Sequence, residues 1–225
     1  MDEYISFEQI PFGSDNFPDN PESRCPCMLL LDTSGSMSGH SIQQLNEGIQ
    51  ALKDDLMRDS LASKRVEIAI VTFGPVKIES EFQTVENFFP QLLVANGDTP
   101  IGAAITLGID LVLKRKQKYR ENGIGYYKPW IILITDGAPT DSWNNAANLV
   151  KEYEAKGQFS FFSIAVDNAD INMLSKLSDL RSPLKLKGHS FREFFLWVSG
   201  SLKPISNKNP GEYNKLLPPS GWAEL

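Results

Sequence analysis

Short apolar runs alternate with longer amphipathic stretches along most of the chain, and this alternation predicts its secondary structure. Short runs of mostly aliphatic and β-branched residues are typical of strands buried on both faces of a parallel sheet. Residues 76–82 alternate apolar with charged side chains, which is typical of a half-exposed antiparallel strand at a sheet edge. A weaker strand is expected at 184–186. The predicted buried strands are 27–32, 66–73, 130–135 and 159–166.

Between these strands, apolar residues recur at spacings of three and four, which predicts helices with one face on the core. A short helix interrupted by Pro90 is expected within residues 84–93. Pro100 is well placed to open the helix that follows it, because proline is favoured at the first helical position. A short helix is expected at 171–180. The longer predicted helices are 42–56, 101–121, 142–156 and 190–202.

Strands that alternate with helices imply parallel strands joined by right-handed crossovers, so we expect an α/β fold with helices on both faces of the sheet. Prolines and turn residues without a sustained period indicate an N-terminal extended arm, residues 1–24, and an extended C-terminal tail, residues 203–225. One domain, residues 25–202, lies between them. The tail is expected to pack on or near the domain, with Trp222 as its candidate anchor.

Oxygen-bearing side chains follow the first predicted strand. The strand runs into Asp32, and Ser34 and Ser36 follow at two-residue spacing, with Gly35 permitting a tight turn. Carboxylate and hydroxyl oxygens are hard donors, which suit Mg²⁺, Mn²⁺ or Ca²⁺. The simpler alternative is that Asp32 caps the next helix and that the serines form an ordinary polar turn.

Two later loops carry donors of the same kind. Thr99 lies in a Gly-Asp-Thr-Pro loop before a predicted helix, and Asp136 follows the most strongly apolar run, residues 130–135. Ligands of open α/β sheets bind at the carboxyl ends of the strands, where the strand order reverses. Asp32, Thr99 and Asp136 are therefore expected to meet at one edge, which favours the metal site over the helix cap.

Composition narrows the class of partner. The 225 residues carry a net charge of −6, which argues against nucleic acid as the partner, because neutralisation of phosphates supplies much of the affinity for nucleic acid.

No apolar run approaches the length of a membrane span, and the acidic start lacks the features of a secretory signal. Cys25 and Cys27 are expected to be reduced thiols, which fits a cytoplasmic protein. The basic run 114–118 is expected to form the solvated end of a helix.

The chain resembles the von Willebrand factor A (VWA) domains over about residues 25–202. Three stretches match their metal-ion-dependent adhesion site (MIDAS) in order and spacing: Asp32-Thr-Ser34-Gly-Ser36, Gly-Asp-Thr99-Pro and Ile-Thr-Asp136-Gly. The resemblance implies a three-layer, Rossmann-like fold with a six-stranded, mostly parallel sheet and one antiparallel edge strand. It implies that Ser34 and Ser36 bind a divalent ion, foremost Mg²⁺, directly. Thr99, Asp32 and Asp136 would bind it directly or through water.

A narrower resemblance links the chain to bacterial cytoplasmic proteins of the TerY/YegL type, which are associated with tellurite resistance and stress operons. The match rests on Arg24-Cys-Pro-Cys, on Ile-Thr-Asp136-Gly-Ala-Pro-Thr-Asp and on the closing Gly-Trp segment. It implies that the partner is a protein kinase or a PP2C-like phosphatase from the same operon.

The expected function is a non-enzymatic protein-binding module that captures an Asp or Glu carboxylate of a partner protein on its metal. The alternative is a metal-assisted phosphohydrolase of the haloacid-dehalogenase type, whose site also opens with an aspartate at a strand end. Such sites usually place a second aspartate two residues later, where this chain has Ser34. A third possibility is a structural domain with a vestigial site.

Other polar residues near these motifs have simpler explanations. His40 is expected to lie at the approach to a helix, and His189 to cap or pack at the start of the last helix. Asp141 flanks the predicted site and is equally suited to be the N-cap of the helix that follows it. Asp167 follows a strand and is a candidate for the rim of the site.

Overall fold

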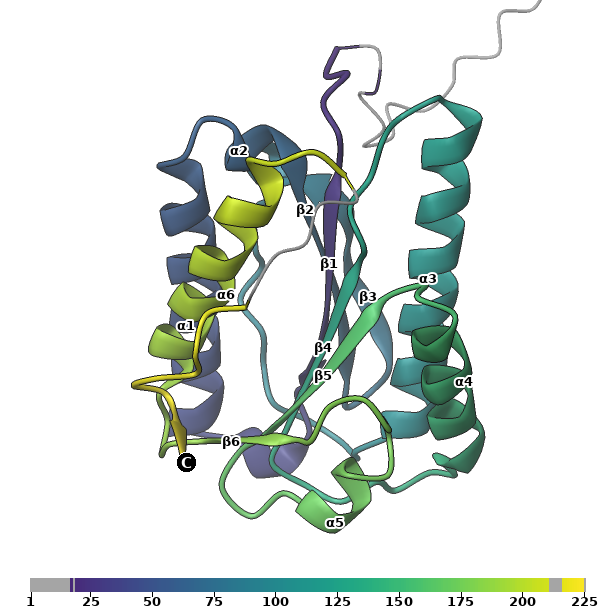
Figure 1. Ribbon diagram of the computed structural model, residues 1–225. Helices are drawn as coiled ribbons and strands as arrows, with labels where there is room; N and C mark the ends of the chain where they lie inside the picture. Colours follow the sequence, from purple (N-terminus) through teal and green to yellow (C-terminus); the bar gives the residue numbers. More distant parts are fainter. Residues whose placement is uncertain (1–16, 18, 211–215, 225) are drawn as a thin grey trace, which may run out of the picture.

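The computed structural model describes residue 17, residues 19–210 and residues 216–224. At its centre is a seven-stranded sheet in the order β3-β2-β1-β4-β5-β6-β7 (Figure 1). The five inner strands are parallel, whereas the two edge strands, β3 and β7, are antiparallel to their neighbours. Most of the predicted arm, residues 1–24, lies outside the described residues. The strands are β1 (Cys25–Asp32), β2 (Val66–Phe73), β3 (Lys77–Thr84), β4 (Trp130–Thr135), β5 (Ser160–Ala165), β6 (Leu184–Leu186) and β7 (Ala223–Glu224).

The predicted α/β fold is confirmed, but the expected sheet of six strands with one antiparallel edge is wrong by one strand. The additional strand, β7, is formed by the tail and pairs with β6. Trp222, directly before β7, is fully buried, and its ring centroid lies 4.9 Å from that of Phe194 and 5.2 Å from that of Trp197. Burial of this large apolar side chain holds the two following residues beside the sheet edge.

Helices cover both faces of the sheet, as Figure 1 shows, with α1, α2 and α6 on one face and α3 and α4 on the other. The side chains of β1 divide accordingly: Leu29 and Leu31 belong to the core under α1 and α6, and Met28 and Leu30 to the core under α3 and α4. Among the described residues, no helix is both long and apolar enough to cross a membrane. The helices are α1 (His40–Met57), α2 (Ala62–Arg65), α3 (Ile101–Glu121), α4 (Asn144–Ala155), α5 (Ile171–Leu174) and α6 (Phe191–Ser206), with two short 3-10 helices, η1 (Gly35–Met37) and η2 (Val85–Asn87).

Three predicted helices differ from the observed ones. Residues 84–93 form only η2 and then an irregular loop that contains Pro90. The helix expected at 171–180 ends as α5 at Leu174. Farther along the chain, the Ser178 hydroxyl accepts the backbone N–H groups of Leu180 and Arg181 and so stabilises a turn in place of the helix. The last helix continues past residue 202 to Ser206, because Arg65 of α2 donates to the Ser206 carbonyl at 2.6 Å and so satisfies the helix end.

The basic run 114–118 is not a fully solvated helix end, which corrects the expectation from the sequence. Arg115 is only 6% exposed and donates two hydrogen bonds of 2.8 Å to Glu67 of β2. Arg24 donates a third to Glu67, at 3.0 Å, and the Tyr119 hydroxyl a fourth. Burial lowers the pKa of Arg24 and raises that of Tyr119. This group of side chains, the Glu67 cluster, joins α3 to the beginning of the sheet.

Candidate metal centre

The five residues predicted to bind metal all lie at the carboxyl edge of the sheet. Asp32 is the last residue of β1, and Asp136 directly follows β4, the neighbouring strand. β2, the next strand in the sequence, lies on one side of β1, and β4 lies on its other side, so the strand order reverses between β1 and β4. Ser34 and Ser36 lie at the turn of η1, and Thr99 lies just before α3. The predicted position, at the reversal of strand order, is therefore where the structure places them.

Hydrogen bonds link four of these residues into one chain. The backbone N–H of Ser34 donates to Asp32 Oδ1 at 2.8 Å. The hydroxyl oxygens of Ser34 and Ser36 lie 3.0 Å apart, and the Ser36 hydroxyl donates to Asp136 Oδ1 at 2.6 Å. Side chains that are 100 residues apart in the sequence are thus in direct contact.

Thr99 reaches the same place from a third loop. Its backbone N–H donates to Thr140 Oγ1 at 3.1 Å, and its carbonyl accepts from the Thr140 N–H at 3.0 Å. A Cβ atom built on Gly137 would lie 3.5 Å from Thr99 Oγ1, so the threonine hydroxyl lies beside the residue after Asp136. That these five residues bind a metal stays a prediction, but the fold brings their oxygens to one place.

The electrostatics of the site fit a cation. Burial raises the pKa of Asp32, although hydrogen bonds from Ser34 and Thr135 favour its charged form. Burial also raises the pKa of Asp136, and the nearby Asp167 carboxylate adds to this effect while the Ser36 hydroxyl opposes it. Across the described part of the chain, no Lys, Arg or His forms an ion pair with Asp32 or Asp136. Two desolvated carboxylates without a basic partner fit a divalent ion.

The donor set is rich in hydroxyls. Within the described residues, no three or more His, Cys, Asp and Glu side chains gather in a way that could hold a metal. Two of the five predicted ligands, Asp32 and Asp136, are carboxylates, so the hydroxyls of Ser34, Ser36 and Thr99 would have to complete the set. Such neutral, hard ligands suit Mg²⁺, Mn²⁺ or Ca²⁺ rather than a soft metal.

Two residues that support the site were missed in the sequence. The Thr135 hydroxyl donates to Asp32 Oδ2 and accepts the Gly137 N–H at 3.2 Å, so it joins the ends of β1 and β4. The signal in the sequence was a hydroxyl residue at the end of an otherwise apolar run. Gly74 has φ of +136°, and a Cβ there would lie 2.5 Å from the Asn96 carbonyl oxygen and 2.7 Å from the Ser34 nitrogen. Glycine at this position lets three loops approach closely.

Asp141 has a different role from the N-cap of α4 that the sequence suggested. Its two carboxylate oxygens accept the backbone N–H groups of Gly102 and Ala103, at 2.9 and 2.8 Å, in the first turn of α3. The loop after β4 therefore caps the helix that follows Thr99. This contact joins the second and third parts of the predicted site.

Replacement of Asp141 by alanine is expected to lower the free energy of unfolding by about 1 kcal/mol, because two N–H groups of α3 lose their acceptor. Urea denaturation followed by circular dichroism measures this change. Asn148→Ala, at an exposed position of α4, is the matched control and should stay within about 0.5 kcal/mol of the wild type. Equal unfolding midpoints for Asp141→Ala and the wild type would contradict the capping role.

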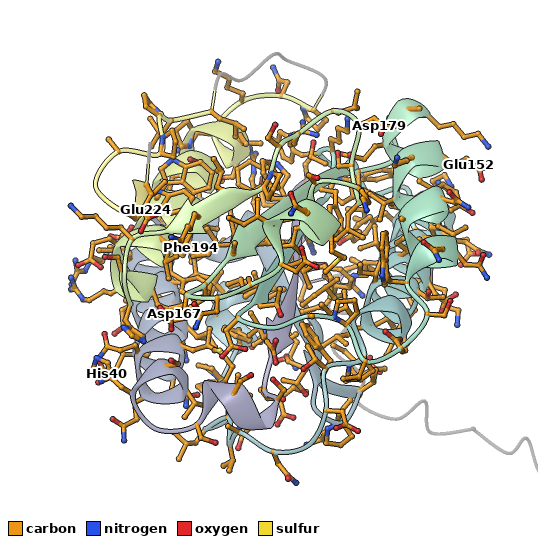
Figure 2. The ribbon with its side chains drawn as sticks, turned by 90° about the horizontal axis from the view of Figure 1, so that it is seen from below. His40, Glu152, Asp167, Asp179, Phe194 and Glu224 are labelled. Atoms are coloured by element: carbon orange, nitrogen blue, oxygen red, sulfur yellow. The ribbon has the colours of Figure 1, made fainter. Side chains whose placement is uncertain are left out.

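The two histidines of the chain lie together beside the predicted site. The rings of His40 and His189 are 5.0 Å apart, His189 Nε2 lies 3.1 Å from the Ser41 hydroxyl, and it lies 3.4 Å from Asp167 Oδ2. Figure 2 looks onto this edge of the molecule and shows His40 and Asp167 on the side of α1. These contacts join the start of α1 to the loops after β5 and β6. Asp167, which the sequence offered as a candidate for the rim, thus contacts His189 and lies close enough to Asp136 for its charge to act on that carboxyl.

Comparison with known proteins identifies the family. The model of the von Willebrand factor type A domain matches residues 28–193. The chain belongs to this family. The matched segment contains all five predicted ligands and runs from β1 into α6, so the family assignment and the observed fold agree.

Curated relatives and solved structures agree with the VWA fold. Inter-alpha-trypsin inhibitor heavy chain H4 of Bos taurus is 28% identical over 144 residues, which cover 61% of this chain and 15% of the relative. Heavy chain H1 of Mesocricetus auratus is 23% identical over 159 residues, covering 67% of this chain and 17% of the relative. The chain thus spans less than a fifth of the length of these curated relatives.

Among solved structures, the pilus adhesin SpaC from Lactobacillus rhamnosus GG has a TM-score of 0.63 at 11% identity, over 81% of this chain and 30% of the adhesin. Proximal thread matrix protein 1 from the mussel byssus, with a zinc-occupied MIDAS motif, has a TM-score of 0.51 at 17% identity, over 80% of this chain and 48% of that protein. At these identities the similarity shows the fold alone.

Proposed function

We propose that the protein is a metal-dependent protein-binding module. The observation that carries this proposal is the series of hydrogen bonds that runs from Asp32 through the two serines to Asp136. These residues come from two loops that are far apart in the sequence and that only the fold brings together. Ser36 is exposed and Asp136 half-buried, so the site opens to solvent. The residues that would hold the ion are Asp32, Ser34, Ser36, Thr99 and Asp136.

The charges of the predicted ligands favour an acidic group of a partner as a further ligand. Three of the five donors are neutral hydroxyls, and the two carboxylates at most balance a divalent charge. An ion held by this set supplies an electrophilic position that a carboxylate oxygen of a partner protein can fill. Asp32, which is fully buried, would anchor the ion from below, while the exposed Ser36 borders the open side.

The identity of the metal follows from donor chemistry. Carboxylate and hydroxyl oxygens favour Mg²⁺, with Mn²⁺ and Ca²⁺ as alternatives. The zinc-occupied MIDAS of the mussel byssus protein adds Zn²⁺ to the ions that need testing. Zn²⁺ more often takes nitrogen and sulfur ligands, which the predicted set lacks, so Mg²⁺ stays our first choice.

We further propose that the protein is not an enzyme. The alternative, a phosphohydrolase of the haloacid-dehalogenase type, would need a general acid two residues after Asp32. Ser34 stands there, and a serine hydroxyl, which here lies 3.0 Å from that of Ser36, is far too weak an acid to take the place of a carboxylic acid. An assay with a generic phosphate ester in the presence of Mg²⁺ or Mn²⁺ separates the two functions.

Several finer expectations rest on the narrower resemblance alone. The relatives that we found are heavy chains of the inter-alpha-trypsin inhibitor, and they lend no support to the TerY/YegL assignment. The tellurite or stress context, a kinase or PP2C-like phosphatase as the partner, and a cytoplasmic location therefore stay predictions. The division into an arm, one domain and a tail also stays a prediction.

A peptide selection tests the proposed function. Random peptides displayed on phage, captured by the immobilised protein in Mg²⁺ and released with chelator, are expected to contain an Asp or Glu. Resynthesised peptides should lose binding when this acid is replaced by its amide, and Asp136→Ala should bind none of them. Ser38→Ala, an exposed serine just after the site, is the matched control and should bind like the wild type. Peptides that bind equally well in chelator would contradict the proposal.

A further inference from the structure

The loop between η2 and α3 exposes apolar side chains beside the candidate metal centre. Leu92 is 80% exposed and Val94 is 73% exposed, whereas Leu93 between them is only 5% exposed. Single exposed apolar residues are common, but neighbouring ones at the edge of a binding site point to an interaction surface. Exposed and buried side chains thus alternate from Leu92 to Val94, in a segment without regular secondary structure.

A side chain of α1 holds this loop in its exposed conformation. The backbone N–H of Leu93 donates to Asn46 Oδ1, and the Leu93 carbonyl accepts from Asn46 Nδ2, both at 2.9 Å. The amide of Asn46 thus pairs with both polar backbone groups of one residue, as a neighbouring strand would. Because Leu93 is fixed inward, Leu92 and Val94 are directed away from the core, and their exposure is a built-in feature of the fold.

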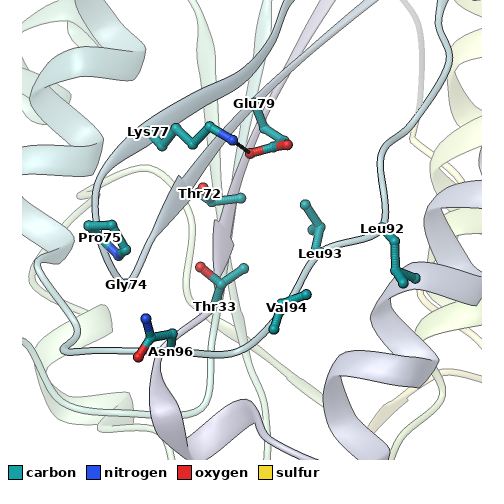
Figure 3. A pocket seen from close by; sticks show the side chains of 10 residues that line it. All are labelled: Thr33, Thr72, Gly74, Pro75, Lys77, Glu79, Leu92, Leu93, Val94 and Asn96. Carbon is teal, nitrogen blue, oxygen red and sulfur yellow. Dashed lines mark ion pairs between the residues drawn. The ribbon is translucent and has the colours of Figure 1, made fainter.

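A groove lies between this loop and the turn that joins β2 to β3, as Figure 3 shows. It has a volume of about 310 Å³. Lys77 and Glu79 form an ion pair of 2.8 Å at one end, so the charges of its lining cancel. We call it the apolar groove, and the residues that matter for its use are Thr33, Thr72, Pro75, Leu92 and Val94.

The apolar groove is continuous with the candidate metal centre. Thr33, in its floor, directly follows Asp32, and the Thr33 carbonyl accepts the Asn96 N–H at 2.6 Å. One residue further along the same loop, the Gly97 carbonyl accepts the Gly35 N–H at 3.0 Å. The loop that forms one wall of the groove therefore also supports the turn that carries Ser34 and Ser36. A chain segment that reaches the metal centre from this side must pass over the groove.

We propose that the apolar groove binds a large apolar side chain of the same partner segment whose carboxylate binds the metal. The inference rests on the proposed function and adds to it the chemistry of the partner: an extended protein segment with an Asp or Glu and, within a few residues, a Leu, Met or Phe. Each part of such a segment matches the surface that it would contact. A metal centre that holds a cation favours a carboxylate, and the groove, whose charged side chains neutralise each other, favours an uncharged side chain. A volume of about 310 Å³ is at the lower end for small-ligand pockets and suits one such side chain.

The peptides selected in Mg²⁺ test this inference. We expect a large apolar residue at a constant distance from the acid, and replacement of that residue by serine should weaken binding about tenfold or more, in line with burial of one such side chain. The protein variant Leu92→Ser/Val94→Ser should show the same loss while it keeps the metal affinity of the wild type in calorimetry. Met57→Ser, an exposed apolar position at the far end of α1, is the matched control.

The outcomes separate the groove from the metal site. Selected peptides that contain an acid but accept any neighbour, together with wild-type binding by Leu92→Ser/Val94→Ser, would overturn the inference and leave the proposed function intact. Failure to select any chelator-sensitive peptide would overturn both. Self-association of the wild type that Leu92→Ser/Val94→Ser abolishes, measured by analytical ultracentrifugation, would assign the groove to a second copy of the chain and also overturn the inference.

Discussion

Replacing both Ser34 and Ser36 by alanine is expected to weaken divalent metal binding by more than about 100-fold, since loss of supporting residues alone costs 10–100-fold at metal sites. The two hydroxyls would be ligands themselves, and they lie in the middle of the hydrogen-bonded chain that ends at Asp136. Isothermal titration calorimetry of the purified protein with Mg²⁺, Mn²⁺, Ca²⁺ and Zn²⁺ measures this loss. The fold should persist, because the two side chains contribute only about 1–2 kcal/mol of hydrogen bonding.

The control for this experiment is Ser38→Ala, which removes an exposed hydroxyl directly after η1 and should bind metal like the wild type. Equal metal affinity in the double variant and the wild type would show that the ion binds elsewhere. No binding by the wild type for any of the four ions would contradict a preformed site. In that case the peptide selection would decide whether a partner carboxylate is required to complete it.

The variant Glu67→Gln is expected to lower the free energy of unfolding by about 3–5 kcal/mol, a large part of the stability of an ordinary domain. Glu67 is 1% exposed and accepts hydrogen bonds from Arg24, Arg115 and Tyr119. Glutamine has nearly the same shape but no charge, so two buried guanidinium groups would lose their counter-charge. Urea denaturation at neutral pH measures the effect.

The matched control is Glu81→Gln, on the exposed side of β3, which should change the free energy of unfolding by less than about 0.5 kcal/mol. The folded fraction of Glu67→Gln should keep its metal affinity. Glu67 pairs with Pro26 near the beginning of β1, six residues before Asp32, so about 20 Å of strand separates the cluster from the metal centre. Wild-type stability of Glu67→Gln would show that the buried ion pairs do not form.

The predicted ligands were found in the sequence because each is marked by its local pattern. Asp32 ends the apolar strand β1 and Asp136 directly follows the apolar strand β4, while Ser34, Ser36 and Thr99 lie in turns next to strand ends or helix starts. Supporting residues were harder to find. Thr135 looks like an ordinary strand residue, and Asp141 looks like the cap of the helix that follows it, until the structure shows that its acceptors serve α3 instead.

The sequence by itself determined the α/β class, the four buried strands, the long helices and the edge position of β3, because each depends on the spacing of apolar residues within one segment. Only the tertiary structure decided the rest: the burial of Arg115 against Glu67, the addition of β7 through Trp222, and the apolar groove. These features depend on contacts between segments that are distant in the sequence. A basic residue on a helix or a tryptophan in a tail has the same local pattern whether or not such a contact exists.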